Sequence, residues 1–368
     1  MTDNVLSASQ KTVLELVRIA MGKRNEKEEL SFDNVNWTEV YSFACSQGVA
    51  AITCDALNIL YDQGCDTIHM PKDLRMLWIG VMMQHESLYE CHKDVITDLL
   101  SLFSKHGIDT MVLKGYGLSL NYPKPNHRPC GDIDIWLRGK QKEADSILKK
   151  ERGIDTHKSS HHTIFEINGC EIENHITILE HDTHRSNIKI DKYLTELSLL
   201  GEERIELDGK SLLLPSDSMN SLFLLRHMSI HFCVDGITIR HLLDWATFVE
   251  RHSVDWNALQ HFAAQTNSLV FLNSINTICR DLLGYCEDLF PVNHQDNTVA
   301  SRIIRDIFSP EFSDDIPSLD SNLVKYGVVK SKRLWHNRWK SKITNTDSFI
   351  SQILCYSINR IKESVLHL

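Results

Sequence analysis

Two aspartates separated by one residue are the side chains in this sequence whose type and spacing point most directly to chemistry. They are Asp132 and Asp134, in the run Gly131-Asp132-Ile133-Asp134-Ile135. Side chains two residues apart in a β-strand project from the same face, so the two carboxylates come close together and repel each other. A hard divalent cation such as Mg²⁺ relieves this repulsion and also binds triphosphate oxygens. The competing interpretation is a pair of solvated strand residues, because Asp-x-Asp is a common pattern.

A third carboxylate near this pair would complete a metal site. Glu171 and Glu173 lie two residues apart in a later predicted strand and therefore share a face. We take Glu173 as the third ligand and Glu171 as the alternative; the competing interpretation of Glu173 is an exposed strand acid. His175 follows on the same face, and an ordinary histidine pKa of about 6.5 would let it orient an acceptor or act as a base. His161 and His162 suggest the same roles more weakly.

Two basic residues near the aspartates are candidates for binding a triphosphate. The ammonium of Lys114 would supply a point charge, and the guanidinium of Arg128 matches phosphate oxygens with two parallel hydrogen bonds. Either residue could instead form a salt bridge that neutralises the acidic strand. Both interpretations stay open from the residues alone.

Helices are predicted before these residues. Asn36 is a plausible N-cap for a helix that Gly48 ends. A longer helix is predicted over about 71–105, because apolar residues that include Leu77 recur there at helical spacing and Gly107 follows. These helices are expected to pack rather than to do chemistry.

The middle of the chain changes to short apolar and alternating patterns. The run 108–113 predicts a buried strand that turns at Gly115 into a helix, and 131–137 predicts a strand with acids on one face and Ile or Leu on the other. A helix over 140–152 follows. Two further segments predict hairpins, 163–178 around Asn168-Gly169 and 204–214 around Asp208-Gly209.

These patterns predict an α+β protein with a mostly antiparallel or mixed sheet and flanking helices. We divide the chain into an N-terminal helical region (1–107), an α+β core (108–215) and a C-terminal helical region (216–368).

Composition limits the partners. The formal net charge of −10 argues against a surface devoted to nucleic acid, which requires a concentrated excess of Lys and Arg. The ten scattered cysteines, without a Cys-x-x-Cys pair or a preceding secretory leader, are interpreted as reduced thiols of a cytoplasmic protein. No apolar run approaches the roughly 20 residues that a membrane-spanning helix needs.

The order and spacing of several short segments resemble the uncharacterised nucleotidyltransferase family of the polymerase-β-like superfamily. The resemblance covers roughly 36–252. The segments that carry it are Trp37 to Leu57, Val112-Leu113-Lys114-Gly115, Tyr122-Pro123, Arg128-Pro129, Gly131-Asp132-Ile133-Asp134-Ile135, Glu173-Asn174-His175, His227-x-x-x-His231 and Arg240-His241-Leu242-Leu243-Asp244-Trp245.

This resemblance implies a nucleotidyltransferase-type mixed sheet and a site that uses Mg²⁺ or Mn²⁺ with a nucleoside triphosphate such as ATP. Asp132 and Asp134 would then bind metal with Glu173, and Gly115 would be the close-approach turn, with Gly131 also at the nucleotide. Two departures from the superfamily pattern are present. Lys114-Gly115 replaces the usual Gly-Ser or Gly-Gly, and the third acid is Glu rather than the more frequent Asp.

The implied reaction moves a nucleoside monophosphate from the triphosphate to an acceptor and releases pyrophosphate. We expect a small-molecule or protein acceptor, because the chain is acidic. Two alternatives stay open: an inactive nucleotide-binding module, and an enzyme that adds nucleotides to RNA through the basic segment 330–342.

Two further features have structural interpretations that we prefer. His227 and His231 share a helical face, but Met228 stands where a zinc protease needs Glu, so we expect them to line a cleft or pack with His241 and Asp244. In 330–342 we expect the tryptophans to anchor a helix and the basic side chains to be solvated; binding to a phosphate-rich partner or a membrane surface is the alternative.

Overall fold

A seven-stranded mixed sheet lies at the centre of the part of the chain that the computed structural model describes, residues 6–25, 30–182, 184–292, 297–310, 328–329, 332–333, 335–345 and 347. The strand order is β3-β4-β5-β2-β1-β7-β6. The strands are β1 (Met111–Val112), β2 (Asp132–Trp136), β3 (His157–Lys158), β4 (His162–Ile167), β5 (Cys170–His175), β6 (Glu202–Leu207) and β7 (Lys210–Pro215).

The pairing within this sheet sets the positions of the acidic residues. β2 runs parallel to β5 and β1 runs parallel to β7, whereas the other neighbouring pairs are antiparallel. The predicted mixed sheet is therefore confirmed. The β2–β5 register pairs Asp132 with Glu171 and Asp134 with Glu173.

Both predicted hairpins are present. The turn between β4 and β5 has positive φ at Asn168 (53°) and Gly169 (79°), and the turn between β6 and β7 has positive φ at Asp208 (47°) and Gly209 (74°). Two consecutive positive φ angles are what a two-residue hairpin turn requires, and they match the twist of the strands. The Asn-Gly and Asp-Gly pairs thus determine both strand registers locally.

Helices precede the sheet, follow it and connect its strands. Their bounds are α1 (Ala8–Ala20), α2 (Trp37–Ser46), α3 (Ala50–Asp62), α4 (Lys72–Ser104), α5 (Tyr116–Ser119), η1 (Pro125–His127), α6 (Gln141–Ile147), the π-helical turn η2 (Leu148–Arg152), α7 (Ser186–Leu200), α8 (Asp217–Val234), α9 (Ile239–Arg251), α10 (Trp256–Gln265), α11 (Leu269–Asp281), η3 (Glu287–Leu289), α12 (Asn297–Phe308) and α14 (Arg338–Thr344). The domain boundaries at residues 107 and 215 stay a prediction.

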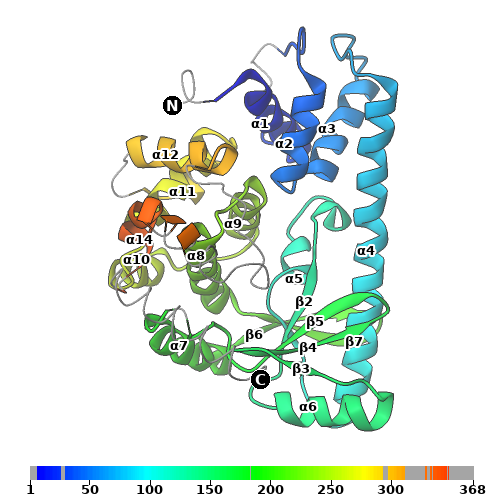
Figure 1. Ribbon diagram of the computed structural model, residues 1–368, viewed down its shortest axis with the longest axis vertical. Helices are drawn as coiled ribbons and strands as arrows, with labels where there is room; N and C mark the ends of the chain where they lie inside the picture. Colours follow the sequence, from blue (N-terminus) through cyan, green and yellow to red (C-terminus); the bar gives the residue numbers. More distant parts are fainter. Residues whose placement is uncertain are drawn as a thin grey trace.

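The long helix α4 confirms the helix predicted over 71–105 and runs along one side of the molecule (Figure 1). Near its start, Trp78 is buried in the same core as α1 to α3, and near its end Leu99 and Phe103 are buried under the sheet. The prediction that Leu77 belongs to the buried stripe is wrong, because this side chain is 59% exposed. The two ends of the helix pack on different partners, so a single apolar stripe does not describe both.

The sheet separates two cores, as its alternating residues require. Ile133 and Ile135 of β2 are buried on the face that α4 covers, together with Leu148 at the start of η2. Trp136 belongs to the opposite face, in a core that contains the N-terminal and C-terminal helices. The prediction that the acids of β2 face one side and its isoleucines the other is confirmed, because Asp132 and Asp134 alternate with these residues and line a cavity on the second face.

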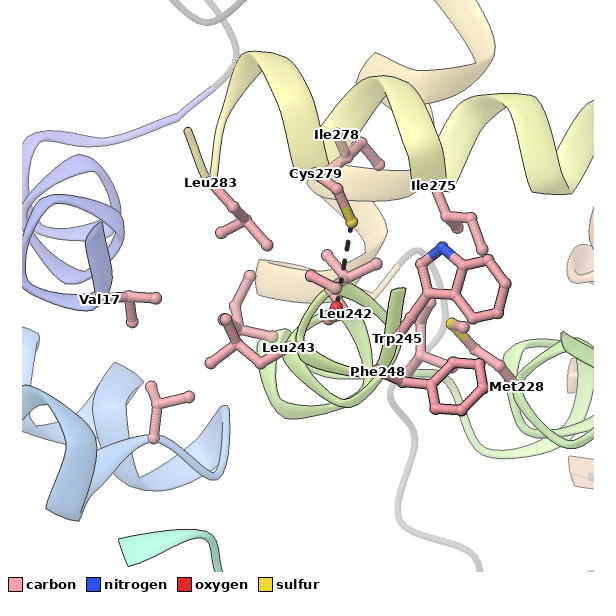
Figure 2. Packing of buried hydrophobic residues seen from close by; sticks show 14 of the residues in the cluster. Val17, Met228, Leu242, Leu243, Trp245, Phe248, Ile275, Ile278, Cys279 and Leu283 are labelled. Atoms are coloured by element: carbon pink, nitrogen blue, oxygen red, sulfur yellow. Dashed lines mark hydrogen bonds between the residues drawn. The ribbon is translucent and has the colours of Figure 1, made fainter. Parts of the chain in front are cut away.

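Helix α9 is the central element of that second core. Figure 2 shows Leu242, Leu243, Trp245 and Phe248 packed among residues of α8 and α11, with Val17 of α1 nearby. All four side chains are fully buried. Burial of this face fixes the position of α9, and α9 also carries polar residues of the candidate site.

Helix α7 was not predicted. In α7 only Ile190 and Leu194 of the large apolar residues are fully buried, whereas Ile188, Leu199 and Leu200 are more than half exposed. Apolar residues on both faces obscure the helical period, which explains why the sequence did not indicate this element.

The segment 330–342 is partly described; residues 330, 331 and 334 lie outside the described residues. The anchoring role expected of the tryptophans is confirmed for Trp339, whose ring meets Phe232 edge-on at 5.4 Å. It is wrong for Trp335, which is 57% exposed. Lys340 is not solvated as expected but buried in an ion pair with Asp306. Among the described residues, no helix combines the length and apolar character that crossing a bilayer requires.

Candidate active site

A cavity of about 320 Å³ opens between the sheet and helices α8 and α9. All the residues predicted to bind the nucleotide or the metal line it, and His175 does not. The lining residues are Lys114, Gly115, Leu118, Arg128, Gly131, Asp132, Asp134, Glu173, Leu224, His227, Met228, His231, Arg240, His241, Asp244 and Trp245. The expectation that His227 and His231 line a cleft is therefore confirmed.

Three carboxylates share one wall of this cavity. Asp132 and Asp134 come from β2, and Glu173 comes from the parallel neighbour β5, beside Asp134. Asp134 is buried, with 2% of its surface exposed, and the Glu173 side chain is 19% exposed. Glu171, the alternative third acid, is exposed and does not line the cavity. The geometry thus favours Glu173, which we took as the third acid, over its alternative Glu171.

Positive charge surrounds Asp134. Its Oδ1 lies 2.8 Å from Lys114 Nζ and 2.9 Å from His175 Nε2. Burial alone would raise the pKa of Asp134, but Lys114 and His175 lower it below its usual range. The pKa of Asp132 is raised, first by burial and then by the negative charge of Asp134. The wall therefore holds one carboxylate whose ionised form is favoured and one whose ionised form is disfavoured.

The turn after β1 brings Lys114 to these acids. Burial opposes the charge of Lys114, yet Asp134 raises its pKa above the ordinary value, so the ammonium stays charged. Gly115 has φ +49° and ψ −106°, and an added Cβ would lie 3.3 Å from the Asp132 carbonyl oxygen. Only glycine adopts this backbone so close to β2 without strain. At Gly131 an added Cβ would meet no atom within 4 Å.

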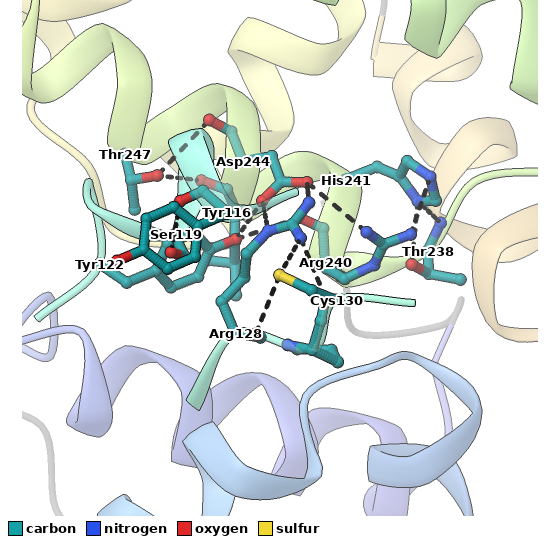
Figure 3. Close-up of polar contacts among 12 residues, drawn as sticks. Tyr116, Ser119, Tyr122, Arg128, Cys130, Thr238, Arg240, His241, Asp244 and Thr247 are labelled. Carbon is teal, nitrogen blue, oxygen red and sulfur yellow. Dashed lines mark hydrogen bonds and ion pairs between the residues drawn. The ribbon is translucent and has the colours of Figure 1, made fainter. Parts of the chain in front are cut away.

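Arg128 is engaged by α9. Figure 3 shows its guanidinium facing the carboxylate of Asp244, with Nε 2.9 Å from Oδ1 and Nη2 2.8 Å from Oδ2. Its Nη1 donates to the Pro129 carbonyl and to Cys130 Sγ. The Tyr122 hydroxyl also donates to Asp244 Oδ1, at 2.7 Å. Arg128 and Asp244 are both more than 90% buried. Arg128 thus neutralises a carboxylate on α9, not one of the acidic strand.

Arg240 is a cavity residue to which the sequence analysis assigned no role. Its side chain is 28% exposed, and its Nη1 lies 3.9 Å from Asp244 Oδ2. The backbone N–H of Arg240 donates to the carbonyl of Gln47, and the side chain packs over Gly48, which anchors the start of α9 to the N-terminal helices. The segment Arg240 to Trp245 was part of the family resemblance, but no pattern in the sequence indicated that Arg240 lines the same cavity as the carboxylates.

His175 lies behind the carboxylates and does not line the cavity. It is 2% exposed, and its Nε2 contacts Asp134 Oδ1 at 2.9 Å and Glu173 Oε2 at 3.5 Å. Burial lowers its pKa, but hydrogen bonds to these two carboxylates raise it above the ordinary value. His161 and His162 lie beside it, with ring centroids 5.4 and 5.6 Å from that of His175. A role for His175 as an orienting residue or base stays a prediction.

The histidines of α8 and α9 form the opposite wall. Burial lowers the pKa of His227 and of His231, with a further contribution from Lys114, and burial lowers the pKa of His241 to about 3. These imidazoles are therefore neutral near pH 7. The Nδ1 of His241 accepts a hydrogen bond from the backbone N–H of Thr238 at the start of α9. They line the site without adding charge to it.

The acidic wall has ligand chemistry suited to a divalent cation. Asp134, Glu173 and His175 each offer a donor atom, and these atoms lie within 4.8 Å of one another, with Asp132 on the same wall. Carboxylate oxygens are the ligands that Mg²⁺ and Mn²⁺ prefer. The residues present therefore fit the metal that the fold family implies.

Comparison with known proteins gives the family. A family model described as an uncharacterised nucleotidyltransferase matches residues 33–284, which is more than half of the chain. The chain is also similar to the crystal structure of an antigenic nucleotidyltransferase-like protein from Paracoccidioides brasiliensis, with 16% identity and a TM-score of 0.36 over 54% of this chain and 96% of that one. No curated protein matches. The family match supports a general function in nucleotidyl transfer. On this match, the chain belongs to the uncharacterised nucleotidyltransferase family.

Proposed function

We propose that the protein is a metal-dependent nucleotidyltransferase that moves a nucleoside monophosphate from a nucleoside triphosphate to a small-molecule or protein acceptor. The observation that carries the proposal is the wall of three carboxylates, Asp132, Asp134 and Glu173, on two parallel neighbouring strands beside a cavity. In the proposed reaction an acceptor oxygen or nitrogen forms a bond to the α-phosphorus. The bond from that phosphorus to the bridging oxygen breaks, and pyrophosphate leaves.

In this proposal Asp132, Asp134 and Glu173 hold Mg²⁺ or Mn²⁺. When bound, the cation would neutralise negative charge on the triphosphate. The raised pKa of Asp132 is consistent with a carboxylate placed for a cation, because burial and the charge of Asp134 both disfavour its ionised form in the absence of one.

Lys114 and Arg240 are the cations that we propose for the triphosphate. Lys114 Nζ lies at the carboxylate wall, and the partly exposed guanidinium of Arg240 lines the same cavity. The Arg128 guanidinium has its three nitrogens directed to protein partners, so we assign it to holding α9 against the loop before β2. Gly115 keeps the turn close to β2 and leaves space for the nucleotide.

A matched pair of variants tests the proposal. Purified full-length protein would be incubated with Mg²⁺, nucleoside triphosphates labelled on the α-phosphate and a cell extract, and both transferred label and released pyrophosphate would be measured. Glu173→Gln and Asp132→Asn should each lower transfer by about 100-fold or more, because each removes charge that stabilises the transition state. Glu171→Gln should retain wild-type transfer, because Glu171 lies two residues away but outside the cavity.

Each other outcome contradicts a part of the proposal. Equal activity in Glu173→Gln and wild type would exclude the carboxylate wall as the site. Binding of the triphosphate without any pyrophosphate release would favour the inactive binding module. Transfer of label to RNA, lost steeply as salt increases, would favour the RNA-directed alternative.

A further inference from the structure

Three histidines form a cluster beside the carboxylate wall that the proposed function does not use. His162 and His175 lie at the paired ends of β4 and β5, and His161 precedes β4. One ligand nitrogen from each histidine lies within 4.8 Å of the others. His162 and His175 are buried, and His161 is partly exposed. The cluster is therefore reachable from the surface through His161.

Three separations between donor atoms in and beside this cluster are close to those of a tetrahedral metal site. His161 Nε2 lies 3.3 Å from His162 Nδ1, and Glu173 Oε2 lies 3.5 Å from both His162 Nδ1 and His175 Nε2. Bonds of about 2.0–2.1 Å to a tetrahedral Zn²⁺ place neighbouring ligand atoms about 3.3–3.4 Å apart. Three donor separations in this cluster agree with that value to within a few tenths of an ångström.

The outer nitrogens of two of these rings are already held in place. His175 Nδ1 donates to the carbonyl of Thr177 at 3.2 Å, so Nε2, which contacts Asp134 and Glu173, is the nitrogen that a metal ion would take over. His161 Nδ1 is hydrogen-bonded to Ser160 Oγ at 3.0 Å, which leaves Nε2 facing His162. Histidines that bind metals in proteins typically have the second ring nitrogen fixed in this way by a carbonyl or another polar group.

We infer that His161, His162 and His175 bind a divalent transition-metal ion of the zinc class, with the carboxylate of Glu173 beside the ion. Imidazole nitrogens select such ions, whereas oxygen-only sites suit Mg²⁺. The site adjoins the carboxylate wall but goes beyond the proposed function, because its occupancy can be measured with no nucleotide present. A bound ion would join the start of β4 to the end of β5, next to the cavity.

The experiment compares zinc binding in variants of the full-length protein. Protein stripped with a chelator would be titrated with Zn²⁺ by calorimetry in millimolar Mg²⁺, and Co²⁺ would be added to a second sample for absorption spectroscopy. Wild type should show one tight site and the strong visible bands of tetrahedral Co²⁺. His161→Ala/His162→Ala should lose the bands and bind Zn²⁺ at least about 100-fold more weakly, since even partners outside the ligand shell contribute about 10- to 100-fold.

Three control variants distinguish loss of a metal ligand from misfolding and from loss of nucleotide transfer. His157→Ala removes an exposed histidine of the neighbouring strand β3 and should bind Zn²⁺ as wild type does. His161→Ala alone, at the most exposed position, should weaken binding with an unchanged circular dichroism spectrum. Asp132→Asn should keep the zinc site while losing nucleotide transfer. Equal zinc affinity in wild type and the double variant, equal loss in His157→Ala, or an octahedral Co²⁺ spectrum would overturn the inference.

Discussion

The buried ion pair between Arg128 and Asp244 gives a prediction whose size can be worked out from the structure. The two side chains share two hydrogen bonds of 2.8 and 2.9 Å, and each residue is more than 90% buried. Burial raises the pKa of Asp244, but Arg128 lowers it below its ordinary value, so both groups are ionised near pH 7. Removal of one partner leaves the other charge buried without its two close hydrogen bonds, although Arg240 Nη1 stays 3.9 Å from Asp244 when Arg128 is replaced.

Asp244→Asn or Arg128→Met should therefore each lower the free energy of unfolding by about 3–5 kcal/mol. That is a large part of the roughly 5–15 kcal/mol that typically stabilises a protein. The double variant removes both charges, and Asn still offers an oxygen to the Tyr122 hydroxyl, which donates to Asp244 at 2.7 Å in the wild type. We expect the double variant to be less destabilised than the sum of the singles by about 2 kcal/mol or more.

Urea unfolding followed by tryptophan fluorescence would give the free energy of unfolding of the wild type, the two single variants and the double variant. Equal dependence of this free energy on urea concentration would show that only stability differs among them. If the two single substitutions add to within about 0.5 kcal/mol, the side chains do not interact energetically and the reasoning from their geometry is refuted. Single-variant losses below about 1 kcal/mol would show that the pair is hydrated and not buried.

Three further predictions use matched variants. Gly115→Ala should lower the free energy of unfolding by about 1–2 kcal/mol, because the φ of +49° at this position disfavours a side chain. Gly131→Ala should change the free energy of unfolding by less than about 0.5 kcal/mol, and urea unfolding would compare the two variants. In the folded protein the pKa of His241 is about 3, whereas in the unfolded chain this side chain gains a proton below about pH 6.5, so the free energy of unfolding falls as the pH is lowered. His241→Gln keeps a residue that can cap the helix and should reduce this loss by up to about 1.4 kcal/mol per pH unit. Urea unfolding at several pH values would measure the difference. Trp339→Ala should lower the unfolding free energy by about 3 kcal/mol, and Trp335→Ala by less than about 0.5 kcal/mol, because only Trp339 packs on the core; thermal unfolding that ranks them equally would contradict this.

Local patterns predicted the strand that carries the acids and the hairpin that follows it. The alternation in β2 depends only on residues 131–137, and the β4–β5 turn depends on Asn168 and Gly169, whose preference for positive φ is intrinsic. These features need no knowledge of distant contacts. Sequence therefore indicated that Asp132 and Asp134 share a face.

Local sequence patterns did not indicate which groups the basic residues contact. Arg128 and Asp244 are 116 positions apart, and their pairing follows from how α9 packs between the helices of the second core. The same packing places Arg240 at the cavity. Whether an arginine binds phosphate or a buried carboxylate depends on which group the fold presents to it, and residue type alone does not contain that information.

Because the two ends of α4 pack in different cores, the chain cannot be truncated at this helix without exposing one of them. The helix has 33 residues, which corresponds to a rod about 50 Å long. Its last turns cover the isoleucines behind the acidic strand. A fragment that begins after residue 107 would lack this cover and present an apolar sheet face to water, where association between copies would compete with folding. The end of α4 is therefore an unsuitable position at which to truncate the protein, although the sequence pattern changes there.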